Sequence, residues 1–244
     1  DALAGRGGVR APSAAEAAAA SPLVLLCVTD YAAVEAVLDA VSDAIAGRTL
    51  VSLTTGSPQE TRRAADRAGQ AGAAYLDGGV QTAPEDLGSD AAMLLYSGPR
   101  ATFDEHRATL GTLGSARYLG ADPAAAAVQD LTLFGLWYDT QVAYLRALET
   151  VRSTGIDVED FAALAAGPLG HVVDATAATA HEVKTGSFPR GPADLTEHEP
   201  VLERLVELRA NQNLGNGALD HVHRLVRRRI ESGHGHEGLT TIID

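Results

Sequence analysis

The sequence predicts an α/β domain with a parallel Rossmann-type sheet, followed by an all-α domain. Over the first half, short apolar runs alternate with helix-forming stretches, which is the pattern of a doubly wound parallel sheet. After residue 120 the strand signals stop, and between Pro123 and Ser153 the only Gly or Pro is Gly135. A helix of that length exceeds most helices of globular domains and suggests a spine shared between domains or subunits. The predicted division is therefore an α/β domain at 1–120, an interdomain helix at 121–153 and a helical domain at 154–244.

Five strands are expected in the first domain. Residues 23–28 are continuously apolar, which indicates a strand buried on both faces. The other expected strands span residues 49–53, 74–76, 92–96 and 116–119. The segment 1–10 predicts the tail of a helix and a turn into a short strand at Val9. A first βαβ unit, roughly 30 residues long, is therefore expected to be missing from the front of the domain.

Helix-start signals follow the strands. Thr29 and Asp30 can cap a helix over 31–46, and Ser57-Pro58-Gln59-Glu60 has the form of a capping box that opens a helix over 58–71. A third helix is expected over 100–113. In the second half, shorter helices are expected over 158–166, 171–184, 195–212, 217–232 and 238–243.

The charge balance argues against nucleic acid as a partner. The chain has 19 basic and 32 acidic residues and a formal charge of −13, whereas phosphate binding uses clustered Lys and Arg. The one basic run, Arg224 with Arg227, Arg228 and Arg229, is expected to charge the end of a helix. No apolar stretch is expected to reach the roughly 18–20 residues of a membrane span. We expect a cytoplasmic protein that does not bind membranes.

Several reactive residue types are scarce. Cys27 is the only cysteine and Lys184 the only lysine, so neither a disulfide framework nor a lysine-dependent mechanism is expected. His234, His236 and Glu237 lie together without further ligands in the sequence. We expect the His pair to be solvated and no metal to be bound.

A Gly-x-Gly-x-x-Gly pattern occurs at Gly233, Gly235 and Gly238. It follows a predicted helix near the C-terminus and not a strand. We therefore do not interpret it as a phosphate-binding loop.

Polar residues follow the predicted strands at their carboxyl ends, where open parallel sheets bind ligands. The segments are Cys27-Val28-Thr29-Asp30, Leu53-Thr54-Thr55-Gly56-Ser57 and Leu76-Asp77-Gly78-Gly79. Hydroxyls and free backbone N–H groups there can hold a ribose, an amide or an anion. Each segment alone is also consistent with generic helix caps, but three at one sheet edge favour a nucleotide or cofactor site.

The long helix carries an acidic residue within an aromatic face. Asp130, Phe134, Trp137, Tyr138 and Gln141 recur at helical spacing. Such a stripe, taken alone, is more often plain core. A carboxylate flanked by aromatics in a partly dry pocket has a raised pKa, however, and can donate a proton or pair with a cation.

These segments resemble the NADPH-dependent imine reductases, of the β-hydroxyacid dehydrogenase superfamily, over nearly the whole chain. The matching segments are Ser21-Pro22-Leu23 with Cys27-Val28-Thr29-Asp30-Tyr31, Leu53-Thr54-Thr55-Gly56-Ser57-Pro58, Tyr75-Leu76-Asp77-Gly78-Gly79, Leu95-Tyr96-Ser97-Gly98, Tyr118-Leu119-Gly120-Ala121-Asp122, and Gly233-His234-Gly235 with Glu237-Gly238. Hydroxyacid dehydrogenases of the superfamily place a lysine and an asparagine at the start of the long helix. The corresponding positions here are Ala126 and Asp130, which argues against alcohol oxidation.

The resemblance implies hydride transfer from NADPH to the carbon of a C=N bond, with a small imine, or a ketone plus an amine, as substrate. It also implies a homodimer whose helical domains intertwine, with each active site between one subunit's Rossmann domain and the other's helices. Asp130 would protonate the imine or pair with the iminium, and Tyr138 would orient the substrate. Pocket walls would come from Phe134, Trp137, Gln141 and His171. Cofactor contacts would come from Val28, Thr29, Asp30, Thr54, Thr55 and Ser57.

Two alternatives stay open from the sequence. One is a hydroxyacid or carbonyl reductase of the same superfamily, and the other is a dimeric binding scaffold without a cofactor. The glycine loop and the basic residue that would hold the adenosine 2′-phosphate lie outside the sequence. Either the sequence is a fragment of a longer chain, or the protein truly lacks the first unit, and only in the second case is weakened cofactor binding expected.

Overall fold

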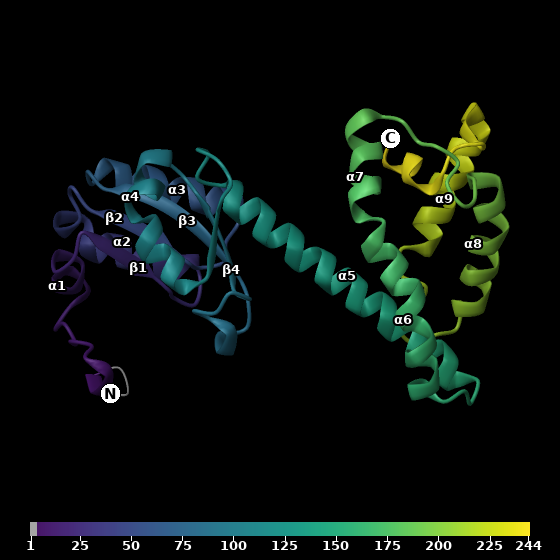
Figure 1. Cartoon of the computed structure of the whole chain (residues 1–244), viewed down its shortest axis with the longest axis horizontal. Coiled ribbons are helices and arrows are strands. Elements are labelled where there is room, and N and C mark those ends of the chain that lie inside the picture. The colour runs from purple at the N-terminus through teal and green to yellow at the C-terminus, as the bar shows by residue number, and fades with distance from the viewer. Residues whose placement is uncertain (1–3) are drawn as a thin grey trace. The chain divides into compact units, whose positions relative to one another are not determined.

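The computed structural model describes residues 4–244 and divides into two compact units, 1–137 and 138–244. The division lies inside α5 (Ala125–Ser153), the long helix that the sequence predicts (Figure 1).

The first unit holds a five-stranded sheet in the order β1-β2-β3-β4-β5. The strands are β1 (Leu23–Leu26), β2 (Thr49–Ser52), β3 (Ala74–Gln81), β4 (Met93–Ser97) and β5 (Ser115–Tyr118). The five predicted strands and the mainly parallel sheet are thus confirmed. The pairing of β3 with β4 is antiparallel, however, with Gly79 opposite Leu95, and this corrects the expectation of an all-parallel sheet.

Strand β3 is longer than its apolar run suggests. The sequence predicts that it ends at Leu76, but the strand continues through Asp77, Gly78 and Gly79 to Gln81. A Cβ on Gly78 would come within 2.8 Å of Leu53 and 3.2 Å of the Leu95 carbonyl oxygen. These glycines therefore allow close packing within the sheet and do not mark a turn.

Helices cover both faces of this sheet. They are α1 (Ala14–Ala19), α2 (Tyr31–Val41), α3 (Pro58–Gln70) and α4 (Arg100–Leu110), with short 3₁₀ turns at Ala4–Arg6, Ser42–Ala44, Pro84–Asp86 and Gly111–Leu113. The predicted capping box is confirmed, because Ser57 Oγ accepts from the Glu60 N–H and the Glu60 carboxylate accepts from the Ser57 N–H. The sequence analysis missed α1.

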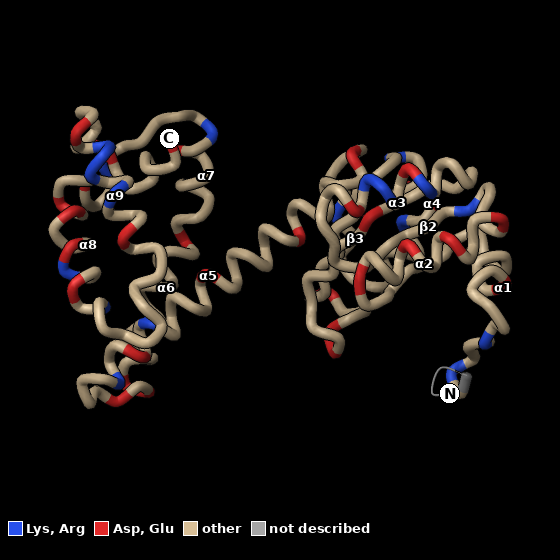
Figure 2. Tube along the Cα trace, turned by 180° about the vertical axis from the view of Figure 1, so that it is seen from behind, with Lys and Arg blue, Asp and Glu red and all other residues tan. Residues whose placement is uncertain are grey.

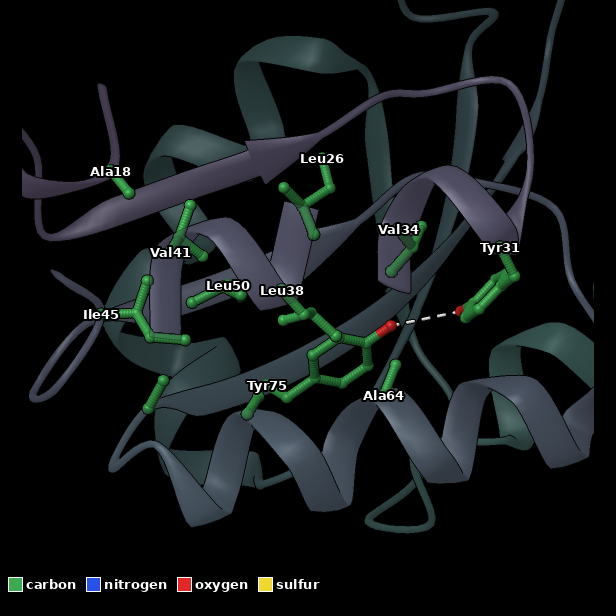
Figure 3. Packing of buried hydrophobic residues seen from close by; sticks show 12 residues of the cluster. Ala18, Leu26, Tyr31, Val34, Leu38, Val41, Ile45, Leu50, Ala64 and Tyr75 are labelled. Carbon is green, nitrogen blue, oxygen red and sulfur yellow. Dashed lines mark hydrogen bonds between the residues drawn. The ribbon is translucent and has the colours of Figure 1, made fainter. Parts of the chain in front are cut away.

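Successive strand residues enter two separate cores. Leu50 and Tyr75 pack with α2 and α3, as Figure 3 shows, whereas their neighbours Val51 and Leu76 pack with Phe103 of α4. Because side chains alternate across a strand, this division places one core on each face of the sheet.

Two expectations for the N-terminal part are wrong. Strand β1 lies at an edge of the described sheet and leaves Leu25 42% exposed, so it is not buried on both faces. Val9 is 96% exposed and lies in no strand. Of the segment 1–10, residues 1–3 lie outside the described residues.

The second unit is helical throughout. Its helices are α6 (Val158–Asp174), α7 (Thr176–Thr185), α8 (Leu195–Arg209) and α9 (Leu219–Arg229), followed by a π-helical turn at Ile230–His234 and a 3₁₀ turn at Leu239–Ile243. The predicted break over residues 167–170 is wrong, because α6 continues through Gly167 and Pro168. Arg227, Arg228 and Arg229 form the last turn of α9, as predicted (Figure 2).

The Gly-x-Gly-x-x-Gly segment is structural. It follows α9, where Gly233 adopts a φ of 93°. Glu237 pairs with Arg229 at 3.1 Å and with His234 Nδ1 at 3.0 Å, so its carboxylate is held within the unit. Within residues 4–244, no group of three His, Cys, Asp or Glu side chains is placed to hold a metal ion.

The helical run 158–185 is long and apolar enough to cross a membrane by length and composition alone, and its most apolar window is 0% buried in this chain. The expectation that no segment reaches that length is therefore wrong. Core helices and interface helices pass the same criterion.

Candidate active site

The start of α5 is fixed against the ends of the central strands by side-chain caps. The Ala126 N–H donates to Ser97 Oγ of β4 at 2.9 Å, and the Ala127 N–H donates to the carboxylate of Asp77 on β3. These N–H groups lie in the first turn of α5. Backbone N–H groups of a first turn have no acceptor within their own helix. The caps therefore determine where the next turn, which carries Asp130, meets the sheet.

Asp130 is a buried carboxyl with two polar neighbours. Its side chain is 2% exposed. Gln81 Nε2 donates to Oδ1 at 2.7 Å, and Thr55 Oγ1 donates to Oδ2 at 3.5 Å. The two carboxylate oxygens are therefore held unequally, with Oδ1 in the shorter hydrogen bond.

Gly79 makes room for this carboxyl. A Cβ at Gly79 would come within 2.5 Å of Asp130 Oδ1 and 2.8 Å of its Cγ. Asp77, Gly79 and Gln81 are alternate residues of β3 and so share one face of the strand. Asp130 thus lies against the glycine, with a carboxyl on one side and an amide on the other.

Behind Asp130 lies a buried network centred on Asp77, which is 2% exposed. The Tyr31 hydroxyl donates to Asp77 Oδ1 at 2.8 Å, and it lies 3.0 Å from the Thr61 hydroxyl and 3.2 Å from the Tyr75 hydroxyl. Figure 3 shows the contact between the two tyrosines. A Cβ on Gly56 would come within 2.1 Å of the Tyr31 ring, so the loop after β2 packs directly on this network.

Burial dominates the proton affinity of both carboxyls. Desolvation raises the pKa of Asp130, and the hydrogen bonds from Gln81 and Thr55 oppose that rise. Desolvation also raises the pKa of Asp77 to about 7, against the hydrogen bond from Tyr31 and with the nearby charge of Asp130 adding to it. The Asp77 carboxyl can therefore hold a proton near neutral pH.

Most of the predicted cofactor-binding residues have structural partners. Thr54 is 4% exposed, and its hydroxyl bridges the backbone N–H and carbonyl of Val28. Asp30 caps α2 through the Ala33 N–H at 2.9 Å, and Ser57 caps α3. The exposed hydroxyls at this edge are those of Thr29 and Thr55, and Thr55 is the one that reaches Asp130.

The aromatic face extends beyond the buried carboxyl. Phe134 is 38% exposed, Trp137 58% and Tyr138 60%, and Gln141 and His171 are also exposed. Phe134 and Trp137 belong to the first unit, whereas Tyr138, Gln141 and His171 belong to the second. The simple-core interpretation of the stripe is therefore wrong for this chain, and the predicted roles of these side chains stay predictions.

Gln81 was not predicted from the sequence as a site residue, nor were the parts played by Asp77 and Gly79. The available signal was the alternation Asp77, Gly79, Gln81, but it is visible only once β3 is known to extend to Gln81. The lysine position of the hydroxyacid dehydrogenases is Ala126, which is 0% exposed. A lysine there would have to enter a packed interior.

Comparison with known proteins decides the family. Residues 122–244 match the C-terminal domain of NADPH-dependent reductive aminase-like proteins, and residues 1–121 match the NAD-binding domain of 6-phosphogluconate dehydrogenase. The chain belongs to the imine reductase and reductive aminase family. It is an NADPH-dependent oxidoreductase that acts on C=N bonds, which confirms the expected activity and cofactor.

Individual members of the imine reductase and reductive aminase family are similar to this chain over almost its full length. An NADPH-dependent reductive aminase of Aspergillus oryzae is 26% identical over 243 residues, which is 98% of this chain and 82% of that protein. A reductive aminase of Aspergillus terreus, solved with NADPH4, cyclohexanone and allyl amine, is 32% identical with a TM-score of 0.89 and covers 100% of this chain and 86% of its own. An imine reductase of Myxococcus stipitatus with NADP⁺ is 29% identical with a TM-score of 0.90 and covers 99% and 86%.

Proposed function

We propose that this reductase acts on small cyclic imines and on iminium ions formed from a ketone and an amine, and that Asp130 protonates or pairs with the substrate nitrogen. The observation that carries the assignment is the buried Asp130 carboxyl, held over Gly79 between Gln81 and Thr55. Burial raises the pKa of Asp130, which favours a carboxyl that can give a proton to an imine nitrogen or pair with an iminium.

The edge formed by the ends of β1 and β2 fits the nicotinamide end of NADPH. Thr29 and Thr55 present exposed hydroxyls there, and such groups can bond a ribose or a carboxamide. When bound, NADPH supplies the hydride that reduces the C=N carbon. Thr55 also lies 3.5 Å from Asp130, so one side chain can contact both the cofactor edge and the proton-bearing carboxyl.

The chain's remaining task is to orient the substrate and to exclude water. An iminium carbon is already electrophilic, and holding it in a reactive geometry supplies much of the rate. In this proposal Tyr138 orients the substrate, and Phe134, Trp137, Gln141 and His171 line its apolar part.

A homodimer is part of the same proposal. In the unit 138–244, the buried residues are confined to Leu195, Val226, Thr241 and the two glycines Gly235 and Gly238. Leu164, Val172 and Val173 of α6 are 75%, 68% and 67% exposed. A helical unit with so little core of its own and so much exposed apolar surface is typical of subunits that bury that surface against a second copy.

The proposed function is tested by following NADPH consumption with a small cyclic imine, on protein whose intact mass has been measured. We expect turnover with the imine, and little reduction of NADP⁺ with hydroxy acids. Turnover with hydroxy acids but not with the imine would favour a hydroxyacid dehydrogenase. NADPH binding without turnover of either substrate would contradict both catalytic assignments.

A further inference from the structure

Gln81, the last residue of β3, makes the shorter of the two side-chain hydrogen bonds to Asp130. Its backbone is held in the β3–β4 ladder opposite Met93, and its side chain is half-buried. The 2.7 Å contact from Nε2 to Asp130 Oδ1 is therefore made from a fixed position and not from a loop.

We propose that Gln81 is a positioning residue for C=N reduction, which holds Oδ1 of Asp130 so that Oδ2 is the oxygen that exchanges a proton with the substrate nitrogen. The inference rests on the proposed function of Asp130.

The unequal bonding of the two oxygens supports this assignment. Oδ1 receives the short bond from Gln81, whereas Oδ2 receives only the 3.5 Å contact from Thr55, itself an exposed hydroxyl. A carboxyl held at one oxygen keeps a single orientation, and its other oxygen faces the side on which Thr55 meets the cofactor edge. Hydrogen bonds to a charged acceptor are stronger than neutral ones, so this orientation is well held.

An amide also suits a carboxyl that changes its charge. Gln carries two N–H donors and a carbonyl acceptor on one planar group. The N–H can donate to Oδ1 both when the carboxyl is ionised and when it carries its proton on Oδ2, because Oδ1 remains an acceptor in both states. A methionine or leucine at this position would fill the space but could not donate this bond.

The titratable surroundings of Asp130 define what a change at Gln81 should do. Asp77 of β3 lies next to it, and Tyr31 of α2 and Tyr75 of β3 lie behind Asp77. Gln81 and Thr55 supply the hydrogen bonds that oppose the desolvation of Asp130. Removal of the Gln81 amide takes away one of the hydrogen bonds that lower the pKa of Asp130, whereas the desolvation that raises it remains. The pKa of Asp130 should therefore move upward.

The test compares Gln81→Met, which removes the hydrogen bonds at similar size, with Gln81→Glu, which keeps the shape and adds a second acid. The pH dependence of kcat and kcat/KM is measured with a cyclic imine. The limb of the pH–rate profile that is absent in Asp130→Asn is assigned to Asp130. Carboxyl ¹³C chemical shifts report the titration of Asp130 without turnover. Gln129→Met, an exposed position one residue before Asp130, is the matched control.

We expect Gln81→Met to lower kcat by about 10- to 100-fold, as for a lost hydrogen bond to a charged group, and to move the Asp130 titration to higher pH. Gln81→Glu should also move that titration to higher pH, because two neighbouring carboxyls resist ionising together. The thermal midpoint and the affinity for NADPH should change little in either variant. Gln129→Met should match the wild type in every readout.

Different failures separate the two proposals. A wild-type protein that reduces no imine, but in which Gln81→Met still raises the titration of Asp130, would overturn the proposed function and leave the coupling of Gln81 to Asp130 standing. Imine reduction with the same pH profile and the same Asp130 titration in all three Gln81 forms would overturn the role of Gln81. A fall in thermal midpoint alone, with no change in the profile, would equally overturn it in favour of a packing role.

Discussion

Gly79 of β3 and Asp130 of α5 are packed so closely that no other residue fits at position 79 with Asp130 in place. A Cβ there would lie 2.5 Å from Oδ1 and 2.9 Å from Cβ of Asp130. The contact joins a strand residue to a helix residue across the site, and it fixes the depth at which the carboxyl sits in the fold.

Gly79→Ala should therefore impair catalysis more than folding. The added methyl group must displace the Asp130 side chain, and a displacement of about 1 Å can reduce the rate by roughly 100-fold. Steady-state kinetics with a cyclic imine measure this effect. Gly69→Ala in α3, where a Cβ meets nothing within 4 Å, is the control and should keep full activity with equal or slightly higher stability. Equal activity in both variants would contradict the close contact.

The hydroxyls of Tyr31 and Tyr96 should differ in their contribution to stability. The Tyr31 hydroxyl donates to the buried Asp77 carboxyl at 2.8 Å, whereas the buried Tyr96 hydroxyl has no hydrogen-bond partner among the described residues. Tyr31→Phe should cost about 1–3 kcal/mol, because it leaves a buried carboxyl short of a donor. Tyr96→Phe should be neutral or stabilising. Denaturant unfolding of both variants checks the pair, and equal losses would contradict the network.

Asp77 should make the stability depend on pH in the direction opposite to that of a salt-bridged acid. Burial raises its pKa from 3.8 to about 7, so between these values the folded protein keeps a proton that the unfolded chain has lost. The free energy of unfolding therefore falls as pH rises through this window.

Asp77→Asn cannot titrate and should show less of this fall. Its thermal midpoint relative to the wild type should rise steadily from about pH 4 to pH 7. Asp139→Asn, at an exposed position of α5, is the control for the removal of one carboxyl group. A constant difference between Asp77→Asn and the wild type across this range would show that Asp77 ionises normally in the folded protein.

The exposed apolar face of α6 should support a dimer. Leu164→Glu places a charge on a residue that is 75% exposed in the single chain, so it should leave the monomer fold intact and weaken self-association. Sedimentation velocity across a concentration range measures this, with Val9→Glu, at a 96% exposed position of the first unit, as the control. A wild-type protein that sediments as a monomer would contradict the proposed dimer.

Local signals were sufficient to predict much of the first unit. The Ser57–Glu60 capping box, the five apolar runs and the uninterrupted stretch after Pro123 each depend on residues a few positions apart. Such patterns reflect the backbone directly, and the corresponding elements are present. Asp130 could also be singled out, because helical spacing placed an acid within an aromatic face.

The parts of the fold and of the candidate site that were not predicted depend on contacts between distant segments of the chain. The pair Gly78-Gly79 has the form of a turn in the sequence, and only the approach of Leu53 and Asp130 explains why a strand needs two glycines. Gln81 lies 49 residues from its partner, and nothing in its local sequence marks it as a site residue. The break predicted in α6 was wrong for the complementary reason, since the local signals of Gly167 and Pro168 do not end the helix.

The most direct test of the assignment of Asp130 is the turnover number of Asp130→Asn with a cyclic imine, measured together with the dissociation constant for NADPH. Asn keeps the size and a hydrogen-bonding oxygen but cannot donate a carboxyl proton or carry a charge. We expect turnover to fall by about 100- to 10,000-fold, as for the loss of a general acid, with the NADPH dissociation constant nearly unchanged. Turnover equal to that of the wild type would contradict the assignment of Asp130 as the group that serves the substrate nitrogen.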